Sequence, residues 1–215
     1  MPVQKPLFLY SDDGDGRRAM ARWMGKLTSV GLYSRNSRDE IHSEVSARVT
    51  KAPWDGKHII VSSPIHLGMD AVITCPTSKT RGNSGRCRLA DINGSDFVKG
   101  LKSLFKKNSN TLERVDFLFE REDDLEDDDL CRIFVGKVRK ELENLQRKNS
   151  ATQVIKIRGA RYTCHRFAGG MKLRRTYSPN EQEASRLSNQ VPGFILSSGD
   201  FSWKAYEEMI NGHFE

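Results

Sequence analysis

The acidic turn "SDDGDG" at residues 11–16 is the first stretch of this 215-residue chain whose residue types and spacing could do chemistry. It follows a short apolar run and precedes residues 17–30, where Met20, Trp23, Met24 and Leu27 recur at helical spacing. Carboxylates that follow a strand can hold Mg²⁺, because hard cations prefer oxygen ligands. The same aspartates can instead cap the helix that begins near Arg17, and this structural interpretation is the favoured one.

The letters "DGDG" at residues 13–16 resemble the first motif of the haloacid-dehalogenase-type phosphatases, a strand followed by D-x-D-G. The resemblance implies a Mg²⁺-dependent phosphoryl-transfer hydrolase in which Asp13 is the phosphoryl-accepting nucleophile and Asp15 the acid/base. That family usually has Thr or Val where this chain has Arg17, and its nucleophile follows the strand directly, whereas Ser11 and Asp12 intervene here. The phosphatase remains an alternative, and Mg²⁺ is a cofactor only under it.

Residues 156–177 carry the stronger binding signal, because cationic and aromatic side chains are interleaved there. Cations displace counterions from phosphates, while aromatic rings and guanidinium planes stack on bases. Residues 131–175 hold thirteen basic and two acidic side chains, so this part of the chain neutralises itself poorly. The candidate nucleic-acid contacts in it are Lys156, Arg158, Arg161, Tyr162, His165, Arg166, Phe167, Lys172, Arg174, Arg175 and Tyr177. The alternative is a solvated face of an antiparallel sheet whose aromatic residues point to the core.

A second basic feature is the stripe Lys99, Lys102 and Lys106, which lies at helical spacing opposite an apolar face. Together with the basic loop at residues 79–88, it would extend the nucleic-acid surface if the two lie on the same side. The acidic run at residues 120–130 precedes the longest predicted helix, so helix capping explains it better than a metal site does.

The elements that position these residues alternate between strands and helices as far as residue 158. Strands are expected at residues 6–11, 57–63, 69–75, 113–120 and 152–159, and helices at 17–30, 39–50, 95–106 and 129–148. Residues 160–178 read as a hairpin that turns at Gly169-Gly170, and a short aromatic helix ends the chain. This order predicts an α/β or α+β fold: a mixed sheet of about five to seven strands layered with helices, then the hairpin and the terminal helix.

Length and composition fit one domain over residues 1–177, which includes the hairpin at 152–177, followed by a linker and helix over 178–215. The aromatic residues Trp203 and Tyr206 of that helix either close the core or meet a protein partner. Four cysteines without metal-ligand spacing indicate a reduced protein without a zinc site, and no run is long enough to span a membrane.

The net charge of +7 and the missing catalytic signatures lead to one main expectation. The chain is expected to be a non-enzymatic, cytoplasmic or nuclear regulatory or accessory protein that binds nucleic acid, RNA being favoured. Many viral accessory proteins are likewise small and basic and have no recognisable catalytic motif. The second alternative, after the phosphatase, is an adaptor whose basic face meets an acidic protein or membrane surface.

Overall fold

Short apolar runs of the sequence form the strands of a seven-stranded sheet and of a separate two-stranded sheet in the computed structural model. The structure describes residues 6–11, 28–32, 54–64, 71–74, 90–120, 128–167, 170–175, 193–196 and 203–211, and all structural statements below refer to these. Its strands are β1 (Leu7–Ser11), β2 (Thr28–Leu32), β3 (His58–Pro64), β4 (Ala71–Thr74), β5 (Ala90–Asn93), β6 (Arg114–Glu120), β7 (Lys156–Phe167), β8 (Gly170–Arg175) and β9 (Gly193–Leu196). Its helices are α3 (Gly94–Gly100), α4 (Lys102–Lys107), α5 (Asp128–Lys148) and α7 (Trp203–Ile210).

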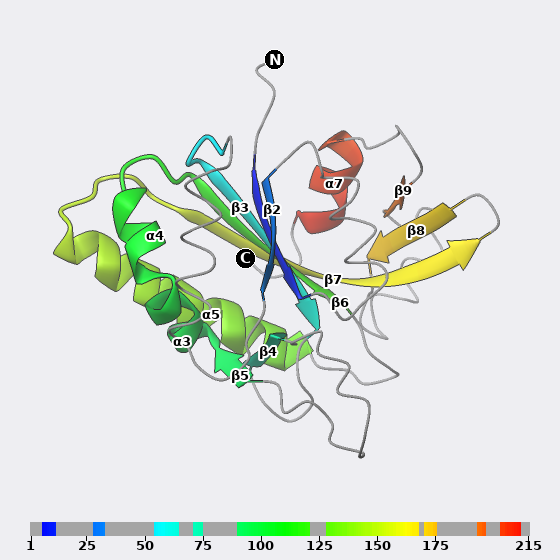
Figure 1. The fold of residues 1–215 in the computed structure, drawn as a ribbon, viewed down its shortest axis with the longest axis horizontal. Coiled ribbons are helices and arrows are strands. Elements are labelled where there is room, and N and C mark those ends of the chain that lie inside the picture. Colours follow the sequence, from blue (N-terminus) through cyan, green and yellow to red (C-terminus); the bar gives the residue numbers. More distant parts are fainter. Residues whose placement is uncertain are drawn as a thin grey trace.

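The sheet has the order β2-β1-β3-β6-β7-β8-β9, and the pairs from β2 to β7 are all parallel. The strands β8 and β9 continue it in antiparallel fashion, while β4 and β5 form a separate antiparallel pair. The helices α3, α4 and α5 lie on one face of the parallel part and α7 lies on the other (Figure 1). The fold is therefore α/β, as expected, with a parallel core of β1, β3, β6 and β7 packed against helices.

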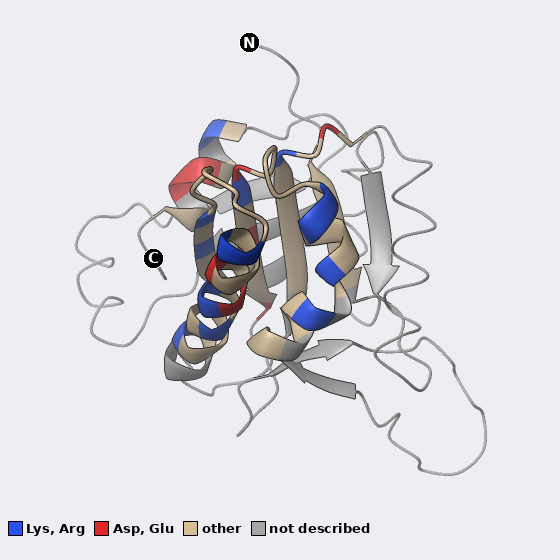
Figure 2. Cartoon of the chain, turned by 90° about the vertical axis from the view of Figure 1, so that its left-hand side faces the viewer, with Lys and Arg blue, Asp and Glu red and all other residues tan. Residues whose placement is uncertain are grey.

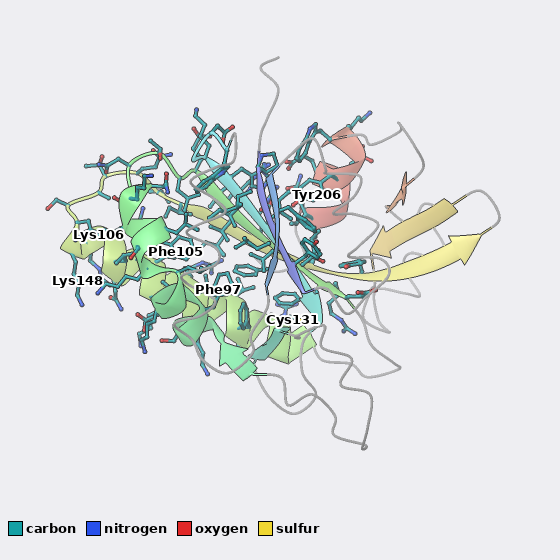
Figure 3. The ribbon with its side chains drawn as sticks, viewed as in Figure 1. Phe97, Phe105, Lys106, Cys131, Lys148 and Tyr206 are labelled. Carbon is teal, nitrogen blue, oxygen red and sulfur yellow. The ribbon has the colours of Figure 1, made fainter. Side chains whose placement is uncertain are left out.

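The main core lies between the sheet and the helices α3, α4 and α5. Alternate residues of β6 point into it, so that Phe117 meets Phe97 of α3 with ring centroids 5.6 Å apart and Phe134 of α5 at 5.3 Å. The two helices also approach closely, because a Cβ on Gly94 would lie 2.3 Å from the carbonyl oxygen of Phe134. Figure 3 shows Phe97 and Phe105 on this side of the sheet and Tyr206 on the side of α7.

Three sequence expectations about the elements are corrected. The helix expected over residues 17–30 cannot reach Val30, because Thr28–Leu32 forms β2, whose backbone pairs with β1 instead. Ile133, expected on the buried stripe of α5, is 46% exposed, whereas Phe134, Val138 and Leu142 are buried. The strand expected from residue 152 begins at Lys156.

Other expectations are confirmed. The apolar residues of the helix expected over residues 95–106 are buried, although this helix is divided into α3 and α4 around Leu101. The hairpin exists, but Gly170 already pairs with Phe167, so β7 and β8 are joined across residues 168 and 169 and not at Gly169-Gly170 as expected. Strand β9 lies beyond residue 177, where the expected domain ends, yet it pairs with β8 and belongs to the same sheet. The helix expected over residues 39–50 lies outside the described residues.

Candidate functional site

The first half of β7 holds four of the residues expected to contact nucleic acid, and the structure exposes Lys156 but buries the other three. Arg158 and Arg161 are 2% and 4% exposed, and Tyr162 is fully buried. The Tyr162 hydroxyl lies 2.9 Å from the hydroxyl of Ser62 on β3. A polyanion on the surface cannot reach these side chains in the folded chain, so they are left out of the interface proposed below.

Arg158 belongs to a buried ionic cluster between the sheet and α7, and Asp116 of β6 is its centre. One carboxylate oxygen of Asp116, Oδ1, accepts from Arg158 Nε at 2.8 Å. The other, Oδ2, accepts from Arg158 Nη2 and from the hydroxyl of Tyr206, each at 2.8 Å. His58 Nε2 lies 2.8 Å from the same Oδ2. The Asp116 carboxylate is therefore fully used by three neighbouring elements, β3, β7 and α7.

Two arginines of the sheet also hold Glu207, the carboxylate that α7 supplies. Arg114 Nη1 donates to Glu207 Oε1 and Arg158 Nη1 to Glu207 Oε2, both at 2.6 Å. Arg158 Nη1 also donates to the side-chain oxygen of Asn211 at 2.7 Å. These contacts join the first residue of β6 and the third residue of β7 to Glu207 of α7 and to Asn211, which directly follows that helix. The cluster therefore fixes the C-terminal helix on the sheet.

The neighbours of His58 determine which of its nitrogens carries the proton. Arg114 Nη2 lies 2.9 Å from His58 Nδ1. Because a guanidinium has donors only, Nδ1 must accept this hydrogen bond. The ring is then the neutral tautomer with its proton on Nε2, where it donates to Asp116. Both ring nitrogens are engaged, and neither is left to activate a nucleophile.

Burial and pairing shift the pKa values of the cluster in opposite directions. Burial lowers the pKa of His58, and the nearby Asp116 carboxylate opposes this only in part. For Asp116, burial alone would raise the pKa, but hydrogen bonds from His58 and Arg158 hold it well below its usual range. Burial and the adjacent Asp116 carboxylate raise the pKa of Tyr206. At neutral pH the cluster thus contains a neutral His58, an ionised Asp116 and a protonated Tyr206.

The position of the cluster argues against an active site. His58 and Arg114 are the first residues of β3 and β6, at the amino ends of parallel strands. Ligands of α/β sheets bind beyond the carboxyl ends instead. The described part of the chain also contains no group of three or more His, Cys, Asp and Glu residues that could hold a metal ion. The contacts of the cluster are suited to holding α7 on the sheet.

The sequence contains one signal for this cluster, the charged residue Asp116 within the apolar run of β6. Phe117 was expected in the core, which places Asp116 on the other face of the same strand. In a parallel sheet that second face is buried as well, so a charge on an inner strand requires a partner. Arg158 stands beside Asp116 in the register of β6 and β7. The α7 partners cannot be read from spacing, because they lie about 90 residues further along the chain.

The exposed cations of the described chain gather on the helical layer. Lys99, Lys102, Lys106 and Lys107 are exposed, and none of them forms an ion pair with another described residue. Their positions follow α3 and α4 as blue bands, whereas α5 carries blue and red bands together (Figure 2). We call these four residues the lysine surface. It includes the three helical lysines predicted from the sequence.

The outer hairpin, defined here as residues 163–175, extends beyond the parallel body. The first half of β7 pairs with β6 up to Tyr162, and from there β7 pairs with β8 instead. The register places His165 opposite Lys172 and Thr163 opposite Arg174. The side chains of this segment, including Arg166, Phe167 and Arg175, are not described, and Tyr177 lies outside the described residues.

The lysine surface and the outer hairpin do not form one surface. They lie at opposite ends of the long axis of the molecule, with α4 at one end and the β7–β8 tip at the other (Figure 1). Lys156, which is exposed, begins β7 at the end where α4 lies. Lys106 of α4 and Lys148 of α5 also lie at that end (Figure 3).

The remaining candidates fall on α7 or outside the described residues. Tyr206 is fully buried against the sheet, and Trp203 packs on it with ring centroids 5.4 Å apart. The aromatic residues of α7 thus contact this chain itself. Asp13, Asp15 and the basic loop at residues 79–88 lie outside the described residues.

Comparison with known proteins returns nothing that bears on function. No protein-family model matches the chain, and searches of curated proteins and of solved structures find no match. Within the described residues, no helix is long and apolar enough to cross a membrane. Any functional conclusion therefore depends on the geometry above.

Proposed function

We propose that this chain is a non-enzymatic nucleic-acid-binding protein of the cytoplasm or nucleus, with RNA as the favoured ligand. The observation that carries the proposal is the lysine surface: four exposed lysines on two short consecutive helices without an ion pair to another described residue. Lysines whose counterions are only dissolved salt gain most from contact with phosphates, because each contact releases an ion. Lysines already paired with carboxylates would have to break those pairs first.

The outer hairpin is the second contact region of the proposal. Residues 163–175 contain four arginines and lysines and no acidic residue, together with His165 and Phe167. On an antiparallel extension beyond the parallel body, in which β8 lies between β7 and β9, such residues can contact phosphates and stack on unpaired bases. This combination favours single-stranded RNA over a duplex.

Fluorescence anisotropy with a labelled single-stranded RNA, the corresponding duplex and single-stranded DNA tests the proposal. The parent chain is expected to bind single-stranded RNA at low salt and to lose affinity steeply as salt rises. The triple variant Lys99→Glu, Lys102→Glu and Lys106→Glu should weaken binding by at least about tenfold, because it replaces three attractive contacts by repulsive ones.

Two control variants separate charge at this place from charge in general. The triple replacement of the same lysines by Arg keeps the charge and should keep the affinity within about twofold. Lys204→Glu changes an exposed lysine of α7, on the other face of the sheet, and should have a similarly small effect.

A further variant tests the hairpin separately. Charge reversal to Glu at Arg166, Lys172, Arg174 and Arg175 should also weaken binding; the buried Arg161 is left intact because its replacement would disturb the fold. A parent chain that binds none of the nucleic acids at about 50 mM salt overturns the proposal. Flotation with anionic vesicles in that case would favour the membrane-surface adaptor instead.

The topology favours one second candidate, the Mg²⁺-dependent phosphoryl-transfer hydrolase. Strand β1 lies between β2 and β3, and the order of strands reverses direction there. The carboxyl ends of strands at such a point are where α/β folds bind ligands. Asp13 follows Ser11, the last residue of β1, by two positions. Phosphatase activity that requires Mg²⁺ and disappears in Asp13→Asn would establish this candidate, and inactivity of the parent chain would dismiss it.

A further inference from the structure

Helix α7 depends on its contacts with the sheet, because an isolated helix of eight residues is not stable in water. Tyr206 and Ile210 are its fully buried apolar contacts. The ionic contacts are those of Tyr206 with Asp116, and of Glu207 with Arg114 and Arg158. The helix also touches β7, β8 and β9, and so lies beside the start of the hairpin.

His58 connects these contacts to the pH of the solution. In its neutral form, Nδ1 accepts the hydrogen bond from Arg114 Nη2 at a distance of 2.9 Å. A proton added to Nδ1 would point at that guanidinium, replacing an attraction by a repulsion between two cations. Arg114 is also the residue that holds Glu207 Oε1. Displacement of Arg114 would therefore remove one of the two arginine contacts of α7.

The groups that face His58 from the packed elements decide the strength of this effect. From β6 come Arg114 and the Asp116 carboxylate, and from β7 comes Arg158, which already binds Asp116 through two nitrogens. From α7 come the uncharged rings of Trp203 and Tyr206, with centroids at 6.1 and 6.4 Å. Asp116 and Glu207 together balance Arg114 and Arg158 before any proton is added, and Arg114 Nε also lies 3.4 Å from Asp116 Oδ2. A charged imidazole would therefore be a third cation beside two carboxylates.

We propose that α7 is an acid-released clasp: protonation of His58 at Nδ1 expels the Arg114 guanidinium and detaches α7 from the sheet. The proton comes from solvent, and no covalent bond between heavy atoms forms or breaks. Release of α7 begins as the pH falls below about 6.5, the ordinary pKa of a histidine side chain. His58 binds a proton in the detached state that the docked state excludes.

Hydrogen exchange measured residue by residue on the full chain tests the clasp. After correction for intrinsic exchange, the protection of amides in α7 should fall by up to about tenfold between about pH 7.5 and pH 5.5, the largest change that one proton with a pKa of about 6.5 can cause. The amides of α5, a helix on the other face of the sheet, should stay better protected than those of α7 at both pH values, because detachment of α7 leaves α5 folded. Equal protection of the two helices at both pH values would mean that α7 opens only by global unfolding and would overturn the clasp, as would protection of α7 that does not change with pH.

Two variants assign the effect to the pair of His58 and Arg114. His58→Gln keeps a donor toward Asp116 but cannot be protonated, so α7 should keep constant protection over the same pH range. Arg114→Met removes the cation that the added proton would repel; α7 should be less protected at neutral pH, and its protection should depend less on pH than in the parent. His213→Gln is the matched control and should behave as the parent. An undiminished pH dependence in both His58→Gln and Arg114→Met would overturn the assignment.

Discussion

Replacing Asp116 by Asn tests the buried cluster with a change of a single heavy atom. The carboxylate is fully buried and accepts hydrogen bonds from Arg158 Nε, Arg158 Nη2 and Tyr206, each 2.8 Å long, in addition to the contact with His58. An amide keeps one oxygen acceptor but presents a donor group to donors at the other position. It also removes the negative charge that Arg158 faces inside the protein.

The expected cost follows from these contacts. Removing one partner of a buried ion pair destabilises a protein by about 3–5 kcal/mol, since the remaining charge stays buried without compensation. Arg158 keeps Glu207, which is half-buried, so the lower part of this range is expected. For a chain of this length, about 3 kcal/mol corresponds to a fall in Tm of about 6–12 °C.

Urea denaturation followed by circular dichroism measures this cost against a matched control. Glu113→Gln makes the same carboxylate-to-amide change at an exposed residue, whose partner Lys57 lies at 2.9 Å. Exposed pairs contribute about 0–1 kcal/mol, so the control should barely change the midpoint. A loss below about 1 kcal/mol for Asp116→Asn, or equal losses for both variants, would refute the reasoning about the buried cluster.

Two further predictions concern packing and pH. Gly94→Ala should destabilise the chain by about 1–3 kcal/mol, because the added Cβ would lie 2.3 Å from a backbone carbonyl oxygen of α5. Gly136→Ala, within α5 and with open space around the added Cβ, should stabilise it by about 0.5–1 kcal/mol; thermal denaturation of both variants checks the pair, and a loss in the second would contradict it. The free energy of unfolding should fall as the pH drops below about 6.5, because unfolded His58 binds a proton that the folded form excludes. It should fall again below about pH 4.5, where Glu207 and Asp116, whose pKa values are lowered in the fold, accept protons only on unfolding; urea midpoints across pH check this, and midpoints that rise on acidification would contradict it.

Local sequence patterns predicted the elements well where one face is apolar. The alternation of Val115, Phe117 and Phe119 identified β6 and its core face, and the spacing of Phe134, Val138 and Leu142 identified most of α5. The hairpin was readable from the glycine pair at residues 169 and 170, although Gly170 is the first residue of β8 and the turn lies one residue earlier. The helical periodicity of Met20, Trp23, Met24 and Leu27 was extended too far, to residue 30, since the backbone of Thr28–Leu32 pairs with β1 in a register that no local signal contains.

The binding residues of β7 were only partly predictable. Charge and aromatic content mark residues 156–177 as one basic segment, but β7 spans two environments. Up to Tyr162 it is an inner strand, so Arg158 is buried by Asp116 and by Glu207 of α7, which lies 49 residues away in sequence. Beyond Tyr162 its neighbour is β8 alone. Composition cannot distinguish these two environments, because burial depends on which distant elements cover each strand.

The salt dependence of RNA binding tests the central claim of nucleic-acid binding through the lysine surface most directly. The slope of log K against log salt would be measured for the parent and for the triple variant with Gln at Lys99, Lys102 and Lys106. Because each phosphate contact contributes about 0.7–0.9 to the slope, the variant should have a slope smaller in magnitude by about 2–3. An unchanged slope, with the fold shown intact by circular dichroism, would contradict the claim that these lysines contact phosphates.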